Sequence, residues 1–241
     1  MHTYFISDLH LTPERPELTR AFFAFMRDLA PSAERLYILG DLFEYWIGDD
    51  GSALIGADEI LDVMGETSKN TECFFIAGNR DFLVREEFSR RTGFTILADE
   101  TVIDLYGTPT LLLHGDSLCI DDVAHQEFRR TFMCNKWKCW WVLRTPLSYR
   151  LKRAQNARKQ SKNNATNMDD AIMDVAERAV IDAFEQAQVI QMIHGHTHRQ
   201  AIHDHETQNG TAKRYVLGDW GATNSILTAS ADGLTLSLIH I

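Results

Sequence analysis

Five short apolar runs along the chain each end in a group of polar and glycine residues. They cover residues 3–7, 36–39, 74–77, 110–113 and 189–193. Runs of this length, bounded by turn residues, are typical of buried strands. Because the carboxyl ends of parallel strands meet at one edge of a sheet, side chains that follow such strands can converge from distant parts of the sequence.

Helical periodicity separates these strands. Residues 18–29 place large apolar side chains on one helical face, residues 59–64 continue a weaker helical pattern, and residues 169–188 form a longer amphipathic one. The other expected elements are a hairpin turn at residues 106–109, between strands at 102–105 and 110–113, and late strands at 214–217 and 234–239. This alternation predicts an α/β fold.

The pattern changes at about residue 121. From there on Arg and Lys alternate with aromatic and aliphatic side chains, and three of the five tryptophans lie between residues 137 and 141. Pro146 interrupts the stretch, which predicts two or more helices joined by a turn. We therefore expect a core made of residues 1–120 and 168–241, with residues 121–167 inserted as a helical lid.

Charge follows the same division. The chain of 241 residues has a net charge of −10, but residues 121–165 contain eleven Lys or Arg and three Asp or Glu, a local balance of +8. The remainder has 13 basic and 31 acidic residues, a balance of −18. An insertion this basic in an acidic protein predicts an anionic partner.

The composition is that of an ordinary globular protein, with 44% hydrophobic and 24% charged residues. There is no run of about 18 apolar residues, so no membrane-spanning helix is expected. The N-terminus lacks the charged and then apolar pattern of a signal peptide. The four cysteines form no C-x-x-C pair, and we expect them to be reduced thiols in a cytoplasmic protein.

Side chains that bind metals follow each of the five apolar runs. The motifs are Asp8-Leu9-His10, Gly40-Asp41, Gly78-Asn79-Arg80-Asp81, His114-Gly115-Asp116 and Gly195-His196-Thr197-His198. In an extended chain residues i and i+2 point to the same side, so the two ligands of D-x-H or of H-x-H can reach one ion. A single carboxylate, such as that of Asp41, can bridge two cations. Mixed oxygen and imidazole ligands suit Mn²⁺, Fe²⁺ or Zn²⁺ better than Ca²⁺.

Each motif by itself has a simpler structural explanation. An isolated D-x-H or Gly-Asp after a strand is usually a cap or a surface turn, and G-N-R-D alone can be a tight turn that holds an ion pair. Coincidence does not account for five such motifs in series, each behind a strand. The series predicts a dinuclear metal site.

In this order the motifs resemble those of the calcineurin-like metallophosphoesterase superfamily, over nearly the whole chain from Asp8 to Asp219. Residues 6–11, 40–50 and 193–199 resemble, more narrowly, the UDP-2,3-diacylglucosamine diphosphatases of lipid A biosynthesis. The resemblance implies a four-layer α-β-β-α sandwich. It also implies hydrolysis of UDP-2,3-diacylglucosamine to UMP and 2,3-diacylglucosamine 1-phosphate (lipid X), with two Mn²⁺ ions and a helical lid that clasps acyl chains.

Carried over motif by motif, the resemblance assigns Asp8, His10, Asp41 and His198 to one metal, and Asp41, Asn79, His114 and His196 to the other. It implies a metal-activated water that attacks the nucleotide-side phosphorus. The implied catalytic residues are Asp41, Asn79, Arg80 and His114. The implied substrate contacts are Asn79, Arg80, His196 and, in the lid, Asp122, Ser161 and Asn164. Residues 163–168 depart from the pattern of the family, which often has a lysine near Met168.

Arg80 stands where many members of the superfamily have histidine. A histidine there can protonate a poor alkoxide leaving group, whereas an arginine keeps its proton at neutral pH. A guanidinium can instead clamp a phosphate through two parallel hydrogen bonds. Arg80 thus favours cleavage of a diphosphate, whose leaving group needs no strong acid. The alternative is that Arg80 only pairs with Asp81 or Glu44.

Residues 42–45 replace the Asp-Arg-Gly of protein phosphatases and argue against phosphoprotein substrates.

The basic, aromatic insertion has three possible roles. It can seat the protein on an anionic membrane and line a groove for acyl chains, grip single-stranded nucleic acid, or form a solvated hairpin with its tryptophans packed inward. We favour the first role. It predicts a UDP-linked acylated sugar lipid as substrate, peripheral contact with the cytoplasmic face of the inner membrane, no nucleic acid and no obligate protein partner. The runner-up is a calcineurin-like nuclease or phosphodiesterase acting on nucleic acid, and a third reading is a metal-stabilised binding module without turnover.

Overall fold

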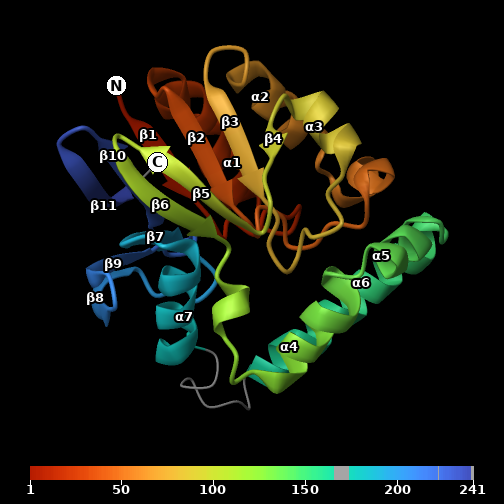
Figure 1. Ribbon diagram of the computed structural model, residues 1–241. Coiled ribbons are helices and arrows are strands. Elements are labelled where there is room, and N and C mark those ends of the chain that lie inside the picture. Colours follow the sequence, from red (N-terminus) through yellow and green to blue (C-terminus); the bar gives the residue numbers. More distant parts are fainter. Residues whose placement is uncertain (166–173, 222, 240–241) are drawn as a thin grey trace.

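Two facing β-sheets form the core of the computed structural model (Figure 1). The structure describes residues 1–165, 174–221 and 223–239, and of residues 162–165 only the backbone. One sheet consists, in spatial order, of β11 (Gly233–Ile239), β10 (Asn224–Ser230), β1 (Thr3–Ile6), β2 (Arg35–Leu39), β3 (Glu72–Ile76) and β4 (Thr95–Ile96). The other consists of β5 (Glu100–Leu105), β6 (Thr108–Leu113), β7 (Gln191–His194), β9 (Gly210–Val216) and β8 (Ala201–Thr207).

Both sheets are mixed, and their parallel strands carry the apolar runs. In the first sheet β1, β2, β3 and β4 run parallel, and β10 and β11 are added antiparallel. In the second sheet β6, β7 and β9 run parallel, and β5 and β8 flank them antiparallel. Since all five expected runs belong to these parallel strands, their carboxyl ends lie at the same end of the sandwich.

Helices cover the outer faces of the two sheets. The α-helices of the described chain are α1 (Pro16–Ala24), α2 (Asp58–Thr67), α3 (Glu86–Thr92), α4 (Val123–Phe128), α5 (Lys136–Leu143), α6 (Leu147–Ala165) and α7 (Glu177–Ala187), of which α4, α5 and α6 belong to the insertion and do not cover a sheet. Phe22 of α1 and Leu61 of α2 pack against Ile38 on the outer face of the first sheet. Phe184 of α7 packs against Met192 on the outer face of the second.

A separate apolar cluster fills the space between the sheets. It contains Phe5 and Leu39 from the first sheet and Leu112 and Ile193 from the second, all fully buried. Helices, sheet, sheet and helix therefore stack in that order, which confirms the expected four-layer α-β-β-α sandwich.

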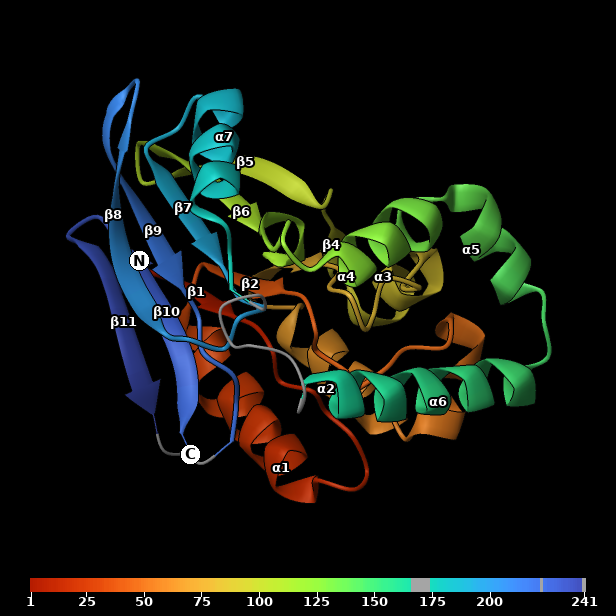
Figure 2. The ribbon, with the colours of Figure 1, turned by 90° about the horizontal axis from the view of Figure 1, so that it is seen from below.

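The basic insertion forms an arm of helices beyond the strand ends (Figure 1). The arm contains α4, a π-helical turn at Arg129–Met133, α5 and α6. Pro146 separates α5 from α6, as expected from its position in the sequence. Figure 2 shows α6 lying across from α4 and α5, so that the arm doubles back on itself. The expected boundary at residues 167 and 168 lies outside the described residues.

Three expected elements were placed wrongly. The hairpin turn consists of Tyr106 and Gly107 alone, because Thr108 and Pro109 already pair with β5. The last helix begins at Glu177, and residues 174–176, which were expected to belong to it, are not helical. Ala176 is extended, with φ −80° and ψ 129°, and its N–H donates to the carbonyl of Leu118, which anchors this stretch to the loop after β6. The strand expected at 189–193 is β7, which begins two residues later, because the N–H of Val189 still bonds to Phe184 in the helical turn. Residues 166–173, in which the longer helix was expected to begin, lie outside the described residues.

Candidate active site

The five motifs meet at one end of the sandwich. Asp8, Asp41 and Asn79 follow β1, β2 and β3 of the first sheet, and His114 and His196 follow β6 and β7 of the second. The two sheets face each other, so the loops after their parallel strands come together although up to 188 positions separate them in sequence. The structure thus brings together the residues that the motifs singled out.

The backbone at these residues is not extended, contrary to the expectation for the D-x-H and H-x-H pairs. Asp8, His10, Asp41, His196 and His198 all have positive φ, between 50° and 69°. Among the described non-glycine residues only two others do. Positive φ is uncommon outside glycine and collects at functional sites, where the surroundings enforce it. The paired side chains converge because tight left-handed turns aim them inward.

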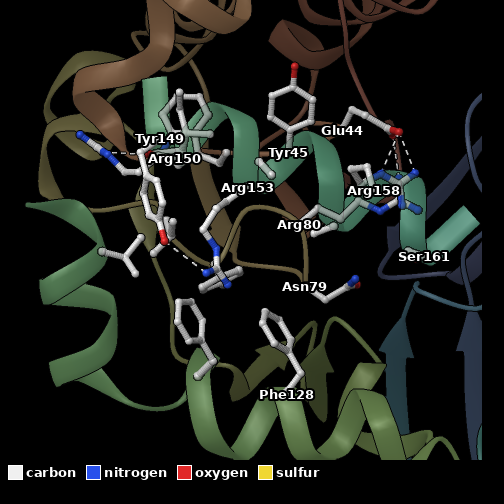
Figure 3. Close-up of a pocket in the computed structure, with 18 of the residues that line it drawn as sticks. Glu44, Tyr45, Asn79, Arg80, Phe128, Tyr149, Arg150, Arg153, Arg158 and Ser161 are labelled. Atoms are coloured by element: carbon white, nitrogen blue, oxygen red, sulfur yellow. Dashed lines mark hydrogen bonds and ion pairs between the residues drawn. The ribbon is translucent and has the colours of Figure 1, made fainter. Parts of the chain in front are cut away.

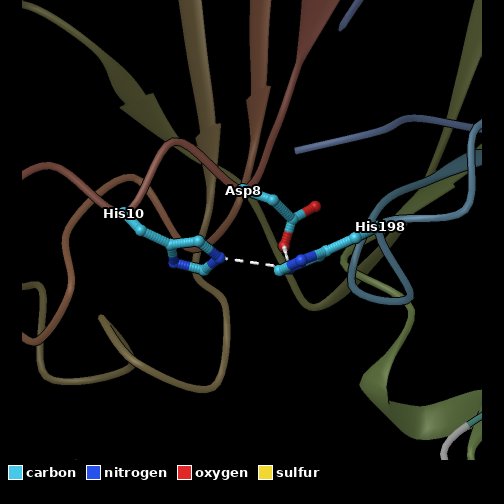
Figure 4. A group of neighbouring side chains, drawn as sticks. All are labelled: Asp8, His10 and His198. Atoms are coloured by element: carbon cyan, nitrogen blue, oxygen red, sulfur yellow. Dashed lines mark hydrogen bonds and ion pairs between the residues drawn. The ribbon is translucent and has the colours of Figure 1, made fainter. Parts of the chain in front are cut away.

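One group of candidate ligands consists of Asp8, His10 and His198, whose ligand atoms lie within 4.8 Å of one another (Figure 4). The Nε2 atom of His198 lies 3.1 Å from Nε2 of His10 and 3.3 Å from Oδ1 of Asp8. Both Oδ1 of Asp8 and Nδ1 of His10 are buried without a hydrogen-bond partner among the described residues. Unpaired buried donors and acceptors are costly, so these atoms fit a bound cation.

A second group consists of Asp8, Asp41 and His114. The Nε2 atom of His114 lies 3.6 Å from Oδ1 of Asp41, 3.0 Å from Oδ1 of Asn79 and 3.2 Å from Nδ1 of His196. Asp8 thus belongs to both groups, whereas the family pattern gives the shared position to Asp41. Asp41 also lies 4.0 Å from the ring of His10, so both carboxylates lie between the two groups.

Hydrogen bonds from the surrounding backbone hold these side chains in place. Nδ1 of His114 contacts the carbonyl of Leu39 at 2.8 Å, which leaves Nε2 facing the site. Oδ2 of Asp8 accepts the N–H of His196 at 2.8 Å, and Oδ1 of Asp41 accepts the N–H of Arg80 at 2.9 Å. Such outer contacts orient metal ligands and set their basicity.

The ionisable groups influence one another strongly because the site is buried. Burial by itself would raise the pKa of Asp8, but the imidazole of His198 beside it holds this pKa far below its usual range. Burial raises the pKa of Asp41. Burial by itself would lower the pKa of His114, but the carboxylates of Asp41 and Asp8 raise it to about 9. Burial and the charge of His114 lower the pKa of His196 to about 3. Buried carboxylates of this kind favour a cation.

A cavity of about 310 Å³ opens beside this cluster, between the core and the lid (Figure 3). Asn79 and Arg80 lie at its end near the candidate ligands. Its apolar walls come from both parts of the chain and include Trp46, Phe82, Leu83, Phe128, Phe132 and Val142. The pocket therefore has mostly apolar walls, with polar side chains at Asn79 and Arg80 and, on α6, at Arg150, Arg153 and Arg158.

Arg80 pairs with Glu44 and Asp41. Its Nη1 donates to Oε2 of Glu44 at 2.7 Å, and its Nε lies 3.2 Å from Oδ2 of Asp41. Of the two partners considered from the sequence, Glu44 is in contact, whereas buried Asp81 accepts the N–H groups of Leu42 and Gly78 instead. Arg80 also lines the pocket, so pairing with Glu44 and facing the pocket are compatible.

Glu44 links the core to the lid. Its Oε1 accepts hydrogen bonds from Nε and Nη2 of Arg158 on α6, at 2.9 and 2.7 Å (Figure 3). Arg158 lines the pocket as well. The sequence did not single out Arg158, because α6 contains several Arg and Lys residues and nothing in the sequence distinguishes this one from the others.

The three lid residues selected from the sequence have different positions. Ser161 lines the pocket. Asp122 does not line it; its carboxylate accepts the N–H of His125 and caps α4. The side chain of Asn164 lies outside the described residues. His125, which the sequence did not suggest, lines the pocket and stacks on the ring of His196, with centroids 5.7 Å apart.

The tryptophans of α5 point to solvent and do not line the pocket. Trp137, Trp140 and Trp141 are 72%, 44% and 64% exposed. The guanidinium of Arg144 lies over the ring of Trp140, 3.5 Å from its centroid. The expectation of a hairpin with tryptophans packed inward is therefore wrong for these three residues.

In the described part of the chain, no helix is long and apolar enough to span a membrane.

Known proteins resemble this chain in sequence over most of its length. A model of the calcineurin-like phosphoesterase family matches residues 1–200. The UDP-2,3-diacylglucosamine hydrolase of Histophilus somni (strain 2336) is 46% identical over 231 residues, which cover 96% of this chain and 97% of that protein. The UDP-2,3-diacylglucosamine hydrolase of Actinobacillus succinogenes is 48% identical over 228 residues, which cover 94% and 95%.

A solved structure of an archaeal phosphodiesterase has a similar fold, with a TM-score of 0.50, 12% identity and coverage of 99% of this chain and 100% of that one. At this identity the likeness shows the fold alone. The family match, together with the two groups of carboxylates and imidazoles, supports divalent metal ions as the cofactor.

Proposed function

The chain belongs to the calcineurin-like phosphoesterase family, and we propose that it hydrolyses UDP-2,3-diacylglucosamine to UMP and 2,3-diacylglucosamine 1-phosphate, a step of lipid A biosynthesis. The observation that carries the proposal is one continuous pocket that joins Asn79 and Arg80 to an apolar wall. A substrate that fits it has phosphate at one end and apolar chains at the other. The relatives are named for a substrate of this kind.

We propose two Mn²⁺ ions as the cofactor. Asp8, His10, Asp41 and His198 would hold one ion, and Asp41, Asn79, His114 and His196 the other. The buried, unpartnered atoms of Asp8 and His10 support this assignment. When bound, the ions would lower the pKa of a water molecule and neutralise charge that develops on phosphorus. Asp8 has a ligand atom in both groups, so it is a second candidate for a shared ligand.

Arg80 would clamp the diphosphate. Its guanidinium now donates to a carboxylate of Glu44 at the polar end of the pocket, and a phosphate oxygen is an acceptor of the same kind. The phosphate would take the place of Glu44, and the nucleotide-side phosphorus would then face the attacking water. The leaving group is a sugar phosphate, so no strong acid is needed at this position.

In the lid, Ser161 would contact the polar part of the substrate, since it lines the pocket near the end of α6. Asp122 would act through α4, whose first turn it caps and whose residue His125 lines the pocket. A contact from Asn164 remains a proposal based on the family pattern. Phe128 and Phe132 would contact the acyl chains, because they form part of the apolar wall.

We further propose that the protein binds peripherally to the cytoplasmic face of the inner membrane. The surface concerned, the α5 patch, consists of Lys136, Trp137, Lys138, Trp140, Trp141 and Arg144. Tryptophan rings suit the boundary between lipid head groups and acyl chains, and the basic residues suit anionic lipids. Between Glu127 and residue 165 the lid contains no acidic residue that would oppose this contact.

The nucleic-acid alternative has less support. Stacking on single strands needs aromatic side chains beside basic ones, and the pocket contains both, but the relatives are named for a UDP-linked acylated sugar and not for nucleic acid. Binding of oligonucleotides that weakens steeply with added salt would favour this alternative.

The decisive experiment is phosphorus NMR of the products formed from UDP-2,3-diacylglucosamine with Mn²⁺ in ¹⁸O-labelled water. We expect the label in UMP, which follows from attack at the nucleotide-side phosphorus. Label in the sugar phosphate would contradict the proposed site of attack. No turnover of this substrate, together with release of mononucleotides from single-stranded DNA, would contradict the proposed function.

A further inference from the structure

Arg214 on β9 connects two histidines beneath the loop that carries His196 and His198. It is 6% exposed. Its Nε donates to Nε2 of His205 on β8 at 3.0 Å, and its Nη1 lies 3.1 Å from Nε2 of His194 at the end of β7. The proposed mechanism does not use these three residues. They do not line the pocket, and Arg214 itself contacts no candidate ligand through a hydrogen bond that the structure describes.

The arginine determines which nitrogen of each imidazole carries the proton. A guanidinium is always a donor and never an acceptor, so the Nε2 atoms of His194 and His205 must accept. Each neutral ring then carries its proton on Nδ1. Nδ1 of His194 accordingly donates to the carbonyl of Gly195 at 2.8 Å, and Nδ1 of His205 donates to Oε1 of Glu177 at 2.8 Å.

The carbonyl of Gly195 is a fixed point of the loop that follows. It also accepts the N–H of Thr197 at 2.9 Å, and the N–H of Gly195 donates to the carbonyl of His114 at 2.9 Å. The loop has little room to move, since a Cβ atom on Gly195 would lie 2.2 Å from the carboxylate of Asp8. In the other neutral tautomer, with the proton on Nε2, Nδ1 of His194 and the carbonyl oxygen of Gly195 would be two acceptors facing each other at 2.8 Å, and this hydrogen bond would be lost.

We infer that Arg214 is a positioning residue for the loop Gly195–His198. Arg214 acts through its contact with His194, and by holding the loop in place it strengthens the binding of metal. The inference rests on the proposed metal ligands His196 and His198. Lysine cannot replace Arg214, because a compact ammonium does not present the planar fork of donors that reaches both rings. Loss of a group that orients metal ligands typically weakens metal binding about 10- to 100-fold.

The test uses the full-length protein and its Arg214→Lys variant. Calorimetric titration with Mn²⁺ should give a Kd about 10- to 100-fold weaker for the variant. The matched control is Glu177→Gln, which changes the exposed end of the same chain of hydrogen bonds and keeps an acceptor for His205; its Kd should stay within about threefold of the parent, since Arg214 and His194 keep their contact.

The second readout is the protonated nitrogen of His194, assigned by ¹H–¹⁵N correlation spectra of the metal-free parent. We expect the proton on Nδ1 in the parent. In folded Arg214→Lys we expect a mixture of the two tautomers of His194. A proton on Nε2 in the parent overturns the inference even if the variant does not fold. Folded Arg214→Lys with the Mn²⁺ affinity of the parent overturns it as well. A parent that binds no Mn²⁺ overturns the proposed metal ligands and, with them, this inference.

Discussion

The Nε2 atoms of His10 and His198 lie 3.1 Å apart, although 188 positions separate the two residues in sequence. Two imidazoles this close need a proton or a cation between their facing nitrogens. Asp8 lies beside them and also belongs to the second group, with Asp41 and His114. Replacing a ligand that belongs to one group only should therefore remove fewer metal ions than replacing a ligand that belongs to both groups.

We predict that His10→Ala leaves about one of the two metal ions bound. Asp8→Ala should lose both ions if Asp8 is the shared ligand, and one ion if Asp41 is the shared ligand. Turnover should fall at least about a thousandfold in each, because charge at phosphorus is no longer balanced. Metal analysis after gel filtration measures the first quantity and a product assay the second. His203→Ala, a change on exposed strand β8, should keep both ions and full turnover. One ion retained in Asp8→Ala would give the shared position to Asp41, and two ions retained would contradict Asp8 as a metal ligand.

Metal binding should strengthen with pH. The pKa of His114 in the metal-free protein is raised to about 9 by the carboxylates around it, after burial has acted in the opposite direction. A metal ion must displace this proton, so its affinity should rise by up to about tenfold per pH unit between pH 7 and pH 9. Mn²⁺ titrations at several pH values measure this pH dependence of the affinity. Affinity that does not change over this range would contradict protonation of His114.

The stability of the metal-free protein should change in the opposite direction. Since the folded-state pKa of His114 lies above its unfolded value of 6.5, its protonation stabilises the fold below pH 6.5, and this contribution is lost as the pH rises through about 9. The increase in Tm on adding metal should therefore be larger at pH 9 than at pH 6.5. Thermal unfolding with and without Mn²⁺, at pH 6.5 and at pH 9, measures this increase in Tm.

The five buried strands and the meeting of the motifs could be predicted from the sequence, because buried parallel strands are continuous apolar runs and each of these ends in a turn with polar or charged residues. The left-handed backbone at Asp8 and His198 could not be predicted, since it is enforced by the packing of two sheets that the sequence does not place. The position of β10 next to β1, where Thr3 pairs with Ala229, also depends on this packing. Nor could the role of Glu44 as a link to Arg158 be predicted, because such a pairing depends on how the lid folds back.

Arg80 should be needed for rate more than for folding. We predict that Arg80→His lowers diphosphatase turnover about a hundredfold, because a clamp that positions the phosphate is lost. The matched control is Arg90→His, which alters an arginine that is 71% exposed in its side chain and pairs with Glu87 on α3. Equal turnover of Arg80→His and the parent would leave Arg80 as a structural partner of Glu44 and contradict the clamp.

Arg150 should anchor the lid to the core. Its side chain is 3% exposed and pairs with both carboxylate oxygens of Asp50, and it donates to the carbonyls of Ile47 and Thr145. Arg150→Met should lower the free energy of unfolding by about 2 kcal/mol, the scale of hydrogen bonds that involve a charged group. Hydrogen exchange should then be faster in α6 than in α1. Uniform loss of protection over the whole chain would contradict a local anchor.

The α5 patch should determine binding to lipid surfaces. Trp137 and Trp141 are the most exposed of its aromatic residues. If each ring loses about 1.5 kcal/mol of apolar burial on replacement, the double variant Trp137→Ser/Trp141→Ser should bind vesicles with anionic lipids about a hundredfold more weakly. Co-sedimentation with vesicles measures this, and turnover of substrate dispersed in detergent should stay unchanged because neither residue lines the pocket.

A matched control is Ile202→Ser, which removes an apolar side chain of 51% exposure from β8, outside the lid. It should bind vesicles as the parent does. The electrostatic part of the contact should weaken with added salt, because screening shortens the reach of Lys136, Lys138 and Arg144. Vesicle binding by the double tryptophan variant at the level of the parent would show that α5 does not contact the membrane, and the basic residues would then need another anionic partner.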